Sequence, residues 1–331
     1  MAGGSDLATR DAVGHGTTTT GIAAGNGRNS VDGKYMGIAP KASIIAVKVT
    51  SDGVPAHDDQ PAEASFYDGN LVFKGMDFVV AKAAELKMPV VMLPNIGSNG
   101  GPTDGTSQFS RKIDEIVGSG IKGVAFLNGP GDEGGAANHA QGTIAPGETA
   151  SLKVEKARAD GIVVDLWYPT IGAGESGLEF TITTPSGESF GPYASVANEG
   201  ARDSRNNDGD PFTYYHNGRD VDFSLSTSQK RQVWISITGE TGTYTIDIKR
   251  GDTAPTSTTF QASLNFANYS QSPANGFTTY ASSGNIWDGA TAFNNISPTN
   301  YVLQNAWTDI DGVARVAPAA AGGNRRHLER Q

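Results

Sequence analysis

The chain has 331 residues, of which 37% are hydrophobic and 18% charged; its formal net charge is −10 and it contains no cysteine. This length and composition suit two domains with packed cores and differ from those of disordered chains. The negative charge argues against nucleic acid as a partner, and the lack of cysteine excludes disulfides, thiolate catalysis and cysteine-based zinc sites.

No run of about 18 apolar residues occurs, so we expect no membrane partner. The first six residues contain neither a basic region nor an apolar one, and they therefore predict no signal peptide. These observations leave the cellular location of the protein open.

The first motif in chain order runs from Gly14 to Gly25, where His15 stands at the start of a predicted helix of small residues. A glycine on each side of His15 allows a sharp bend and a close approach of the backbone. A histidine in such a place can accept and donate a proton near neutral pH. A lone Gly-His-Gly would favour a histidine that only caps a turn, but Gly21 and Ala24-Gly25 make this run more specific.

The next segments alternate between strand and helix patterns. After the turn Gly37-Ile38-Ala39-Pro40, the almost entirely apolar run 42–49 predicts a buried parallel strand. Residues 63–86 have helical spacing, and residues 89–93 predict a further strand. A strand, a helix and a strand in this order indicate a parallel sheet with crossover helices. His57-Asp58-Asp59 lies in the polar loop between the run 42–49 and the helical pattern at 63–86. A solvated loop is favoured over a metal site there.

Two glycine-rich loops follow predicted strands. Residues 95–101 follow the strand at 89–93 and form an expected exposed edge that could pair with an extended peptide. Residues 129–135 follow a strand predicted at 124–127. Between them, Gly105-Thr106-Ser107 looks like a nucleophile motif, but the bulky Gln108-Phe109-Ser110 that follows argues against that role.

From about residue 141 the pattern changes to short β-rich runs separated by turns, which predicts an antiparallel sandwich. The clearest runs are 162–168, 178–182, 233–237 and 243–248. The oxygen-rich loop from Asp203 to Asp210 is a weak candidate for calcium, because its spacing misses the EF-hand pattern. No other cofactor is indicated.

Taken in order, His15-Gly16-Thr17, the Gly-x-Ala-Pro turn at 37–40 and the glycine-rich loop at 129–135 resemble motifs of the subtilisin-like serine peptidases, or subtilases. The resemblance covers about residues 11–140 and 284–312. It implies an α/β fold, a subtilisin-like parallel sheet with crossover helices, interrupted by a jelly-roll-like antiparallel β-sandwich as in one subgroup. The implied domains are a partial catalytic domain at 1–140, the sandwich at 141–275, a return to the catalytic domain at 276–315 and a tail at 316–331.

The resemblance also implies a chemistry, namely peptide-bond hydrolysis by an Asp-His-Ser triad acting on a polypeptide. His15 takes the position of the general base. Asp132 takes the position of the family asparagine that donates to the oxyanion, with Asn128 as the alternative assignment. The implied substrate-binding edge consists of Ile96, Gly97, Ser98 and Gly100. A secreted or cell-envelope location is expected from the family.

The sequence departs from the family at two essential places. Neither Asp6 nor Asp11 begins the Asp-x-Gly motif of the triad aspartate, and no Gly-Thr-Ser nucleophile motif follows residue 312. Removing the serine or the histidine of a subtilisin triad lowers turnover about a million-fold, as the enzyme's own mutants show. We therefore expect an internal piece of a peptidase that is inactive alone. The alternatives are a pseudopeptidase or peptide- or glycan-binding module, and a structural domain without a ligand.

Overall fold

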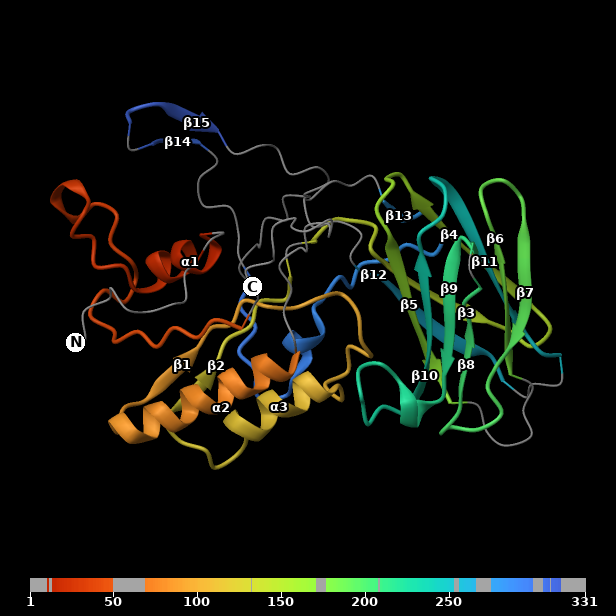
Figure 1. The fold of residues 1–331 in the computed structure, drawn as a ribbon, viewed down its shortest axis with the longest axis horizontal. Coiled ribbons are helices and arrows are strands. Elements are labelled where there is room, and N and C mark those ends of the chain that lie inside the picture. Colours follow the sequence, from red (N-terminus) through yellow and green to blue (C-terminus); the bar gives the residue numbers. More distant parts are fainter. Residues whose placement is uncertain are drawn as a thin grey trace, which may run out of the picture. The chain divides into compact units, whose positions relative to one another are not determined.

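The computed structural model describes residues 11, 14–49, 69–131, 133–170, 177–207, 209–252, 256–265, 275–299, 306–309 and 311–316. The chain divides into two compact units, residues 1–90 and residues 91–331. Figure 1 shows the elements of both units.

The first unit contains two α-helices, α1 (His15–Ala24) and α2 (Gly69–Leu86), and the short 3-10 helix η1 (Val31–Gly33). The strand predicted at 42–49 is wrong, because this run belongs to no sheet among the described residues and Ile44 is 54% exposed. A close approach to α2 is nevertheless present, since a Cβ atom at Gly75 would lie 3.1 Å from a methyl group of Val49. An apolar run forms a buried strand only when neighbouring strands cover it. His57, Asp58 and Asp59 lie outside the described residues.

The second unit begins with a small sheet in which β1 (Val90–Met92) pairs with β2 (Val124–Phe126). Helix α3 (Gln108–Val117) connects them, and its spacing buries Ile113 and Ile116. The amide of Leu127, just after β2, donates to the carbonyl of Met92 at 2.9 Å. The carboxyl ends of the two strands therefore meet at one edge.

The predicted fold class is wrong. The described residues contain three α-helices, and their larger sheets are antiparallel, so the protein is mostly β and does not have a subtilisin-like parallel sheet with crossover helices. Residues 42–49 supply no strand, and the pairing of Leu127 with Ile296 is an isolated bridge. The domain boundaries expected from the sequence stay a prediction.

Most of the second unit consists of two antiparallel sheets that share one core. The six-stranded sheet has the order β3-β12-β5-β10-β9-β8 and the five-stranded sheet the order β13-β4-β11-β6-β7. Their strands are β3 (His139–Ile144), β4 (Thr149–Lys156), β5 (Ile162–Pro169), β6 (Leu178–Thr183), β7 (Ser189–Ala194), β8 (Arg202–Arg205), β9 (Phe212–Asn217), β10 (Lys230–Ile237), β11 (Gly242–Arg250), β12 (Thr258–Asn265) and β13 (Gly276–Phe277). Every β-rich run singled out in the sequence between 162 and 248 lies in one of these strands. The remaining elements are η2 (Arg219–Val221), η3 (Asp288–Thr291), β14 (Ala306–Thr308) and β15 (Ala314–Val316).

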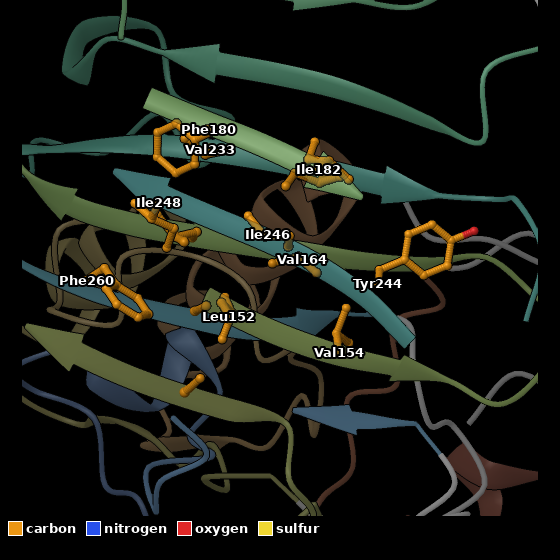
Figure 2. Packing of buried hydrophobic residues seen from close by; sticks show 14 of the residues in the cluster. Leu152, Val154, Val164, Phe180, Ile182, Val233, Tyr244, Ile246, Ile248 and Phe260 are labelled. Carbon is orange, nitrogen blue, oxygen red and sulfur yellow. The ribbon is translucent and has the colours of Figure 1, made fainter. Parts of the chain in front are cut away.

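The core lies between the two large sheets. Figure 2 shows side chains from both sheets meeting there, among them Leu152, Val164 and Ile246, each 0% exposed. Alternation along β4 and β11 turns every second residue inward, as a half-buried strand requires. Burying side chains of this size stabilises the fold by roughly 1.5–3 kcal/mol each. The sandwich thus supplies a rigid base for the loops attached to its outer face.

No helix among the described residues is long and apolar enough to cross a membrane. Within the same described part of the chain, no three acidic or histidine side chains gather as metal ligands would. In the loop considered for calcium, the carboxylate of Asp203 pairs with Arg205 at 3.0 Å, and that of Asp210 accepts from Asn207 at 2.9 Å. Both carboxylates are engaged within their own part of the chain.

Candidate functional site

His15 is the first residue of α1 and its side chain is exposed. Gly14 precedes it with φ at +87°, a conformation that glycine adopts without strain. The carboxylate of Asp11 accepts hydrogen bonds from the amides of Gly14 and Thr17, at 2.8 and 2.7 Å, and from the Thr17 hydroxyl at 2.7 Å. The bond from the Thr17 side chain is the largest cause that lowers the pKa of Asp11. Asp11 thus holds the turn that presents His15.

The small residues of α1 allow a close backbone contact between the carboxyl-terminal end of this helix and residues 37–39. The amides of Ile38 and Ala39 donate to the carbonyls of Ile22 and Ala23, at 3.2 and 2.8 Å. A Cβ atom at Gly37 would lie 2.6 Å from the amide nitrogen of Gly25, which leaves room only for glycine. The Gly-x-Ala-Pro turn of the sequence therefore fastens the end of the histidine helix.

In the second unit, the segments that follow β1 and β2 lie together, because these two strands are neighbours. The first was predicted to bind substrate and the second to include the oxyanion position. The segment Ile96 to Gly101 follows β1, and the segment Asn128 to Gly131 follows β2. Ile96, Gly97 and Ser98 are half-buried, and Gly100 is buried. Gly100 is also pressed against the sandwich, since a Cβ atom there would lie 2.4 Å from the side-chain amide of Asn265.

Trp287 touches both of these segments. A Cβ atom built on Gly97 would lie 2.4 Å from Cε3 of the indole, and one built on Gly131 would lie 2.7 Å from its Nε1. The indole Nε1–H donates to the Glu133 carboxylate at 2.9 Å. The ring therefore fills the space beside both glycines, and neither position tolerates a side chain without movement.

Backbone hydrogen bonds fix Trp287 in this place. Its amide donates to the carbonyl of Pro130 at 2.9 Å, and the amide of Asp288 donates to the carbonyl of Ser98 at 3.2 Å. Just before them, the Asn285 side chain donates to the carbonyls of Glu133 and Ala136, at 3.0 and 2.7 Å. The segment 285–288 thus bridges the predicted substrate-binding edge and the loop after β2.

A buried carboxylate, Asp288, stands at the start of η3. Its oxygens accept hydrogen bonds from the hydroxyl of Ser107 and, at 3.2 Å, from the amide of Thr103. Burial raises the pKa of Asp288 to about 6, while the Ser107 hydrogen bond acts in the opposite direction. The same Ser107 oxygen accepts from the Ser110 amide at 3.0 Å and so caps α3. This structural role agrees with the argument against Ser107 as a nucleophile.

A second buried carboxylate holds the same loop to the sandwich. Asp165 on β5 accepts from the amide of Gly101 at 2.7 Å and from the Gln232 side chain at 2.8 Å. Burial raises the pKa of Asp165 to about 6. Three residues further on, Lys230 forms an ion pair with Asp104 at 2.9 Å. Loop 97–107 is therefore anchored to the six-stranded sheet at Gly101 and at Asp104.

The structure describes only one of the two residues considered for the oxyanion position. Asp132 lies outside the described residues. Asn128, the alternative, is 0% exposed, and neither its Nδ2 nor its Oδ1 has a hydrogen-bond partner in the described part of the chain. A Cβ atom at Gly289 would lie 2.8 Å from Nδ2 of Asn128, so this amide faces the interior. The predicted roles of His15, Asp132 and the edge at 96–100 stay predictions.

Trp287, Asp288 and Asp165 were not singled out from the sequence. Asp165 carried a local signal, because it is the one charged residue within the apolar run Ile162 to Tyr168. Trp287 and Asp288 carried none, since their partners lie more than 150 residues earlier in the chain.

No protein-family model matches the chain, and no curated protein matches it. Among solved structures, the chain is similar to the CspB protease of Clostridium perfringens, with a TM-score of 0.64 and 20% sequence identity. The similarity covers 87% of this chain and 55% of that protease. The chain therefore shares a fold with part of a protease and spans about half of that protein's length.

Proposed function

We propose that the chain is a subtilase-type peptidase module, of the subgroup with a β-sandwich insertion, that holds an extended polypeptide at the edge Ile96, Gly97, Ser98 and Gly100. The observation that carries the proposal is the junction of this edge with the loop after β2, where β1 and β2 end. The fold shared with a protease supports it. The negative net charge of the chain also suits a polypeptide better than a nucleic acid as its partner.

In this proposal His15 is the general base of a serine peptidase and Asp132 occupies the oxyanion position. His15 is exposed and lies on a turn that hydrogen bonds to Asp11 hold in place, which suits a group that exchanges protons. Acyl transfer needs such a base next to a nucleophile. The sequence holds no Gly-Thr-Ser motif of the family type. We therefore propose that these 331 residues bind a polypeptide and do not hydrolyse it by themselves.

The test combines a binding assay with an activity assay on the purified chain. Titration calorimetry with unlabelled extended peptides should show saturable binding, whereas a fluorophosphonate probe should label no serine and peptide hydrolysis should stay at background. Asp132→Asn alone should not restore labelling, because an oxyanion donor without a nucleophile cannot retain the probe. Stoichiometric labelling of Ser107 or another serine would show that the assigned site is wrong, and absence of peptide binding would refute the binding role.

A peptide-binding pseudopeptidase is the second candidate. The observation that favours it is the position of Trp287, which fills space between the substrate-binding edge and the loop after β2. The two candidates predict different behaviour for a longer chain to which Asp-x-Gly and Gly-Thr-Ser motifs have been added. Such a chain should cleave peptides if the first proposal holds, and with Asn at 132 it should cleave them faster; it should bind without cleavage if the second holds.

A further inference from the structure

Loop 222–226, which follows η2, presents two large apolar side chains to solvent. Phe223 is 41% exposed and Leu225 is 57% exposed. Leu225 also has a φ of +45°, in the left-handed region that a bulky side chain rarely adopts. Strained backbone of this kind persists only where the surrounding structure enforces it, and it gathers at sites that hold ligands.

Hydrogen bonds hold this loop in its shape. The carboxylate of Asp222 accepts from the amides of Ser224 and Ser226, at 2.9 and 3.1 Å, and from the Ser226 hydroxyl at 3.0 Å. The amide of Gln108 donates to the carbonyl of Ser224 at 3.0 Å. The side chain of Leu225 takes part in none of these bonds, so its exposed position is set by the backbone around it.

Aromatic side chains of the six-stranded sheet support the loop. The ring of Phe223 packs edge-to-face on Tyr215 of β9 and on Trp234 of β10, with ring centroids 5.2 and 5.5 Å apart. The guanidinium of Arg202 on β8 lies 4.5 Å from the centroid of the Phe223 ring. Aromatic and arginine side chains grouped in this way supply most of the binding energy of many protein–protein interfaces.

Two exposed guanidinium groups flank the apolar side chains. Arg202 donates to the Asn217 side chain at 2.7 Å and to the carbonyl of Val221 at 2.5 Å, and Arg111 of α3 donates to the carbonyl of Leu225 at 2.7 Å. Neither arginine pairs with a carboxylate in the described part of the chain. The two carbonyls lie within about 14 Å of each other, because only a few residues join them. One short peptide can therefore reach both cations.

We infer that loop 222–226 and the two arginines beside it form a docking surface for an acidic polypeptide segment. Carboxylates of the partner meet Arg111 and Arg202, and an apolar side chain of the partner covers Phe223 and Leu225. Complementary charge of this kind gives specificity, since the chain as a whole carries a net charge of −10 and repels acidic partners elsewhere. The surface includes no residue of the edge at 96–100, so the inference goes beyond the proposed function.

The test titrates the whole chain with a blocked peptide that alternates glutamate and leucine, and with matched lysine–leucine and glutamate–serine peptides. The wild-type protein should bind the glutamate–leucine peptide about tenfold or more tightly than either counterpart. Arg111→Glu should abolish this preference, whereas Arg28→Glu, an equal change of charge at another exposed position, should keep it. Equal binding of the three peptides by the wild-type protein would overturn the inference. A preference that survives Arg111→Glu would place the acidic peptide elsewhere, and would overturn the inference while the proposed function stands.

The variant Leu225→Asn separates docking from folding. Asparagine adopts a positive φ more readily than leucine, so the melting temperature of this variant should equal or exceed that of the wild-type protein. Its affinity for the glutamate–leucine peptide should nevertheless fall about tenfold. A clear fall in the melting temperature would show that Leu225 serves the fold and would contradict the inference. Tighter binding of a single-stranded oligothymidylate than of the glutamate–leucine peptide would identify a nucleic-acid surface and would contradict it as well.

Discussion

The carboxylate of Asp288 accepts a hydrogen bond from the hydroxyl of Ser107, which lies 181 residues earlier in the chain. Through this contact the first turn of α3 is fastened to η3 and, by way of the neighbouring Trp287, to the predicted substrate-binding edge and the loop after β2. The geometry of the candidate site therefore depends on polar contacts over long stretches of sequence as much as on the core of the sandwich.

Ser107→Ala should lower the free energy of unfolding by about 1–2 kcal/mol, because it removes both the cap of α3 and the hydrogen bond from Ser107 to Asp288. Urea denaturation followed by circular dichroism measures the effect. Ser119→Ala, at an exposed position just after α3, should change the stability by less than about 0.5 kcal/mol. Equal effects of the two changes would contradict a special role of Ser107.

Asp288 should make stability depend on pH in an unusual direction. Its pKa is raised from 3.8 to about 6, so the folded state holds the proton more tightly than the unfolded state. The stabilisation that the protonated Asp288 gives to the folded state is fully present below about pH 4 and is lost as the pH rises through 6. The free energy of unfolding changes by about 3 kcal/mol at most. The measurement is the difference in unfolding free energy between the wild-type protein and Asp288→Asn from pH 4 to 7. This difference should shift against the wild-type protein as the pH rises, and a constant difference would show that Asp288 does not titrate in this range.

Asp165→Asn should loosen loop 97–107. Both oxygens of Asp165 accept from N–H donors, Gly101 and Gln232, so an asparagine would turn its own NH2 toward one of them. We expect a loss of roughly 1–3 kcal/mol and faster hydrogen exchange at the Gly101 amide. Asp220→Asn on the surface is the matched control and should leave that amide unchanged. Unaltered exchange in Asp165→Asn would rule out the anchoring role.

Gly97→Ala should destabilise the protein, because the new methyl group would lie 2.4 Å from the Trp287 ring. Overpacking of this kind typically costs about 1–3 kcal/mol. In the double variant with Trp287→Ala the clash disappears, so the Gly97→Ala change should then cost much less. Thermal unfolding of the four proteins of this cycle gives the coupling, and additive effects would mean that Gly97 and Trp287 do not touch.

The sequence alone determined the elements whose pattern is local. Alternation predicted the sandwich strands that became β5, β6, β10 and β11, and helical spacing at 63–86 predicted the helix that became α2. Small residues at Gly21, Ala24 and Gly25 likewise predicted a helix that packs closely, and the bonds between residues 37–39 and the end of α1 confirm it. These predictions succeed because period and residue size act within a few neighbouring positions.

Only the tertiary structure decided which distant residues meet. The run 42–49 has the composition of a buried strand and lies outside any sheet in the described part of the chain, because a strand depends on partners that its own sequence does not supply. Likewise, nothing near Trp287 or Asp288 in the sequence indicates Gly97, Gly131 or Ser107. Their meeting results from the pairing of β1 with β2 and from the return of the chain after the sandwich, and hydrogen bonds over such separations leave no periodic trace in the sequence.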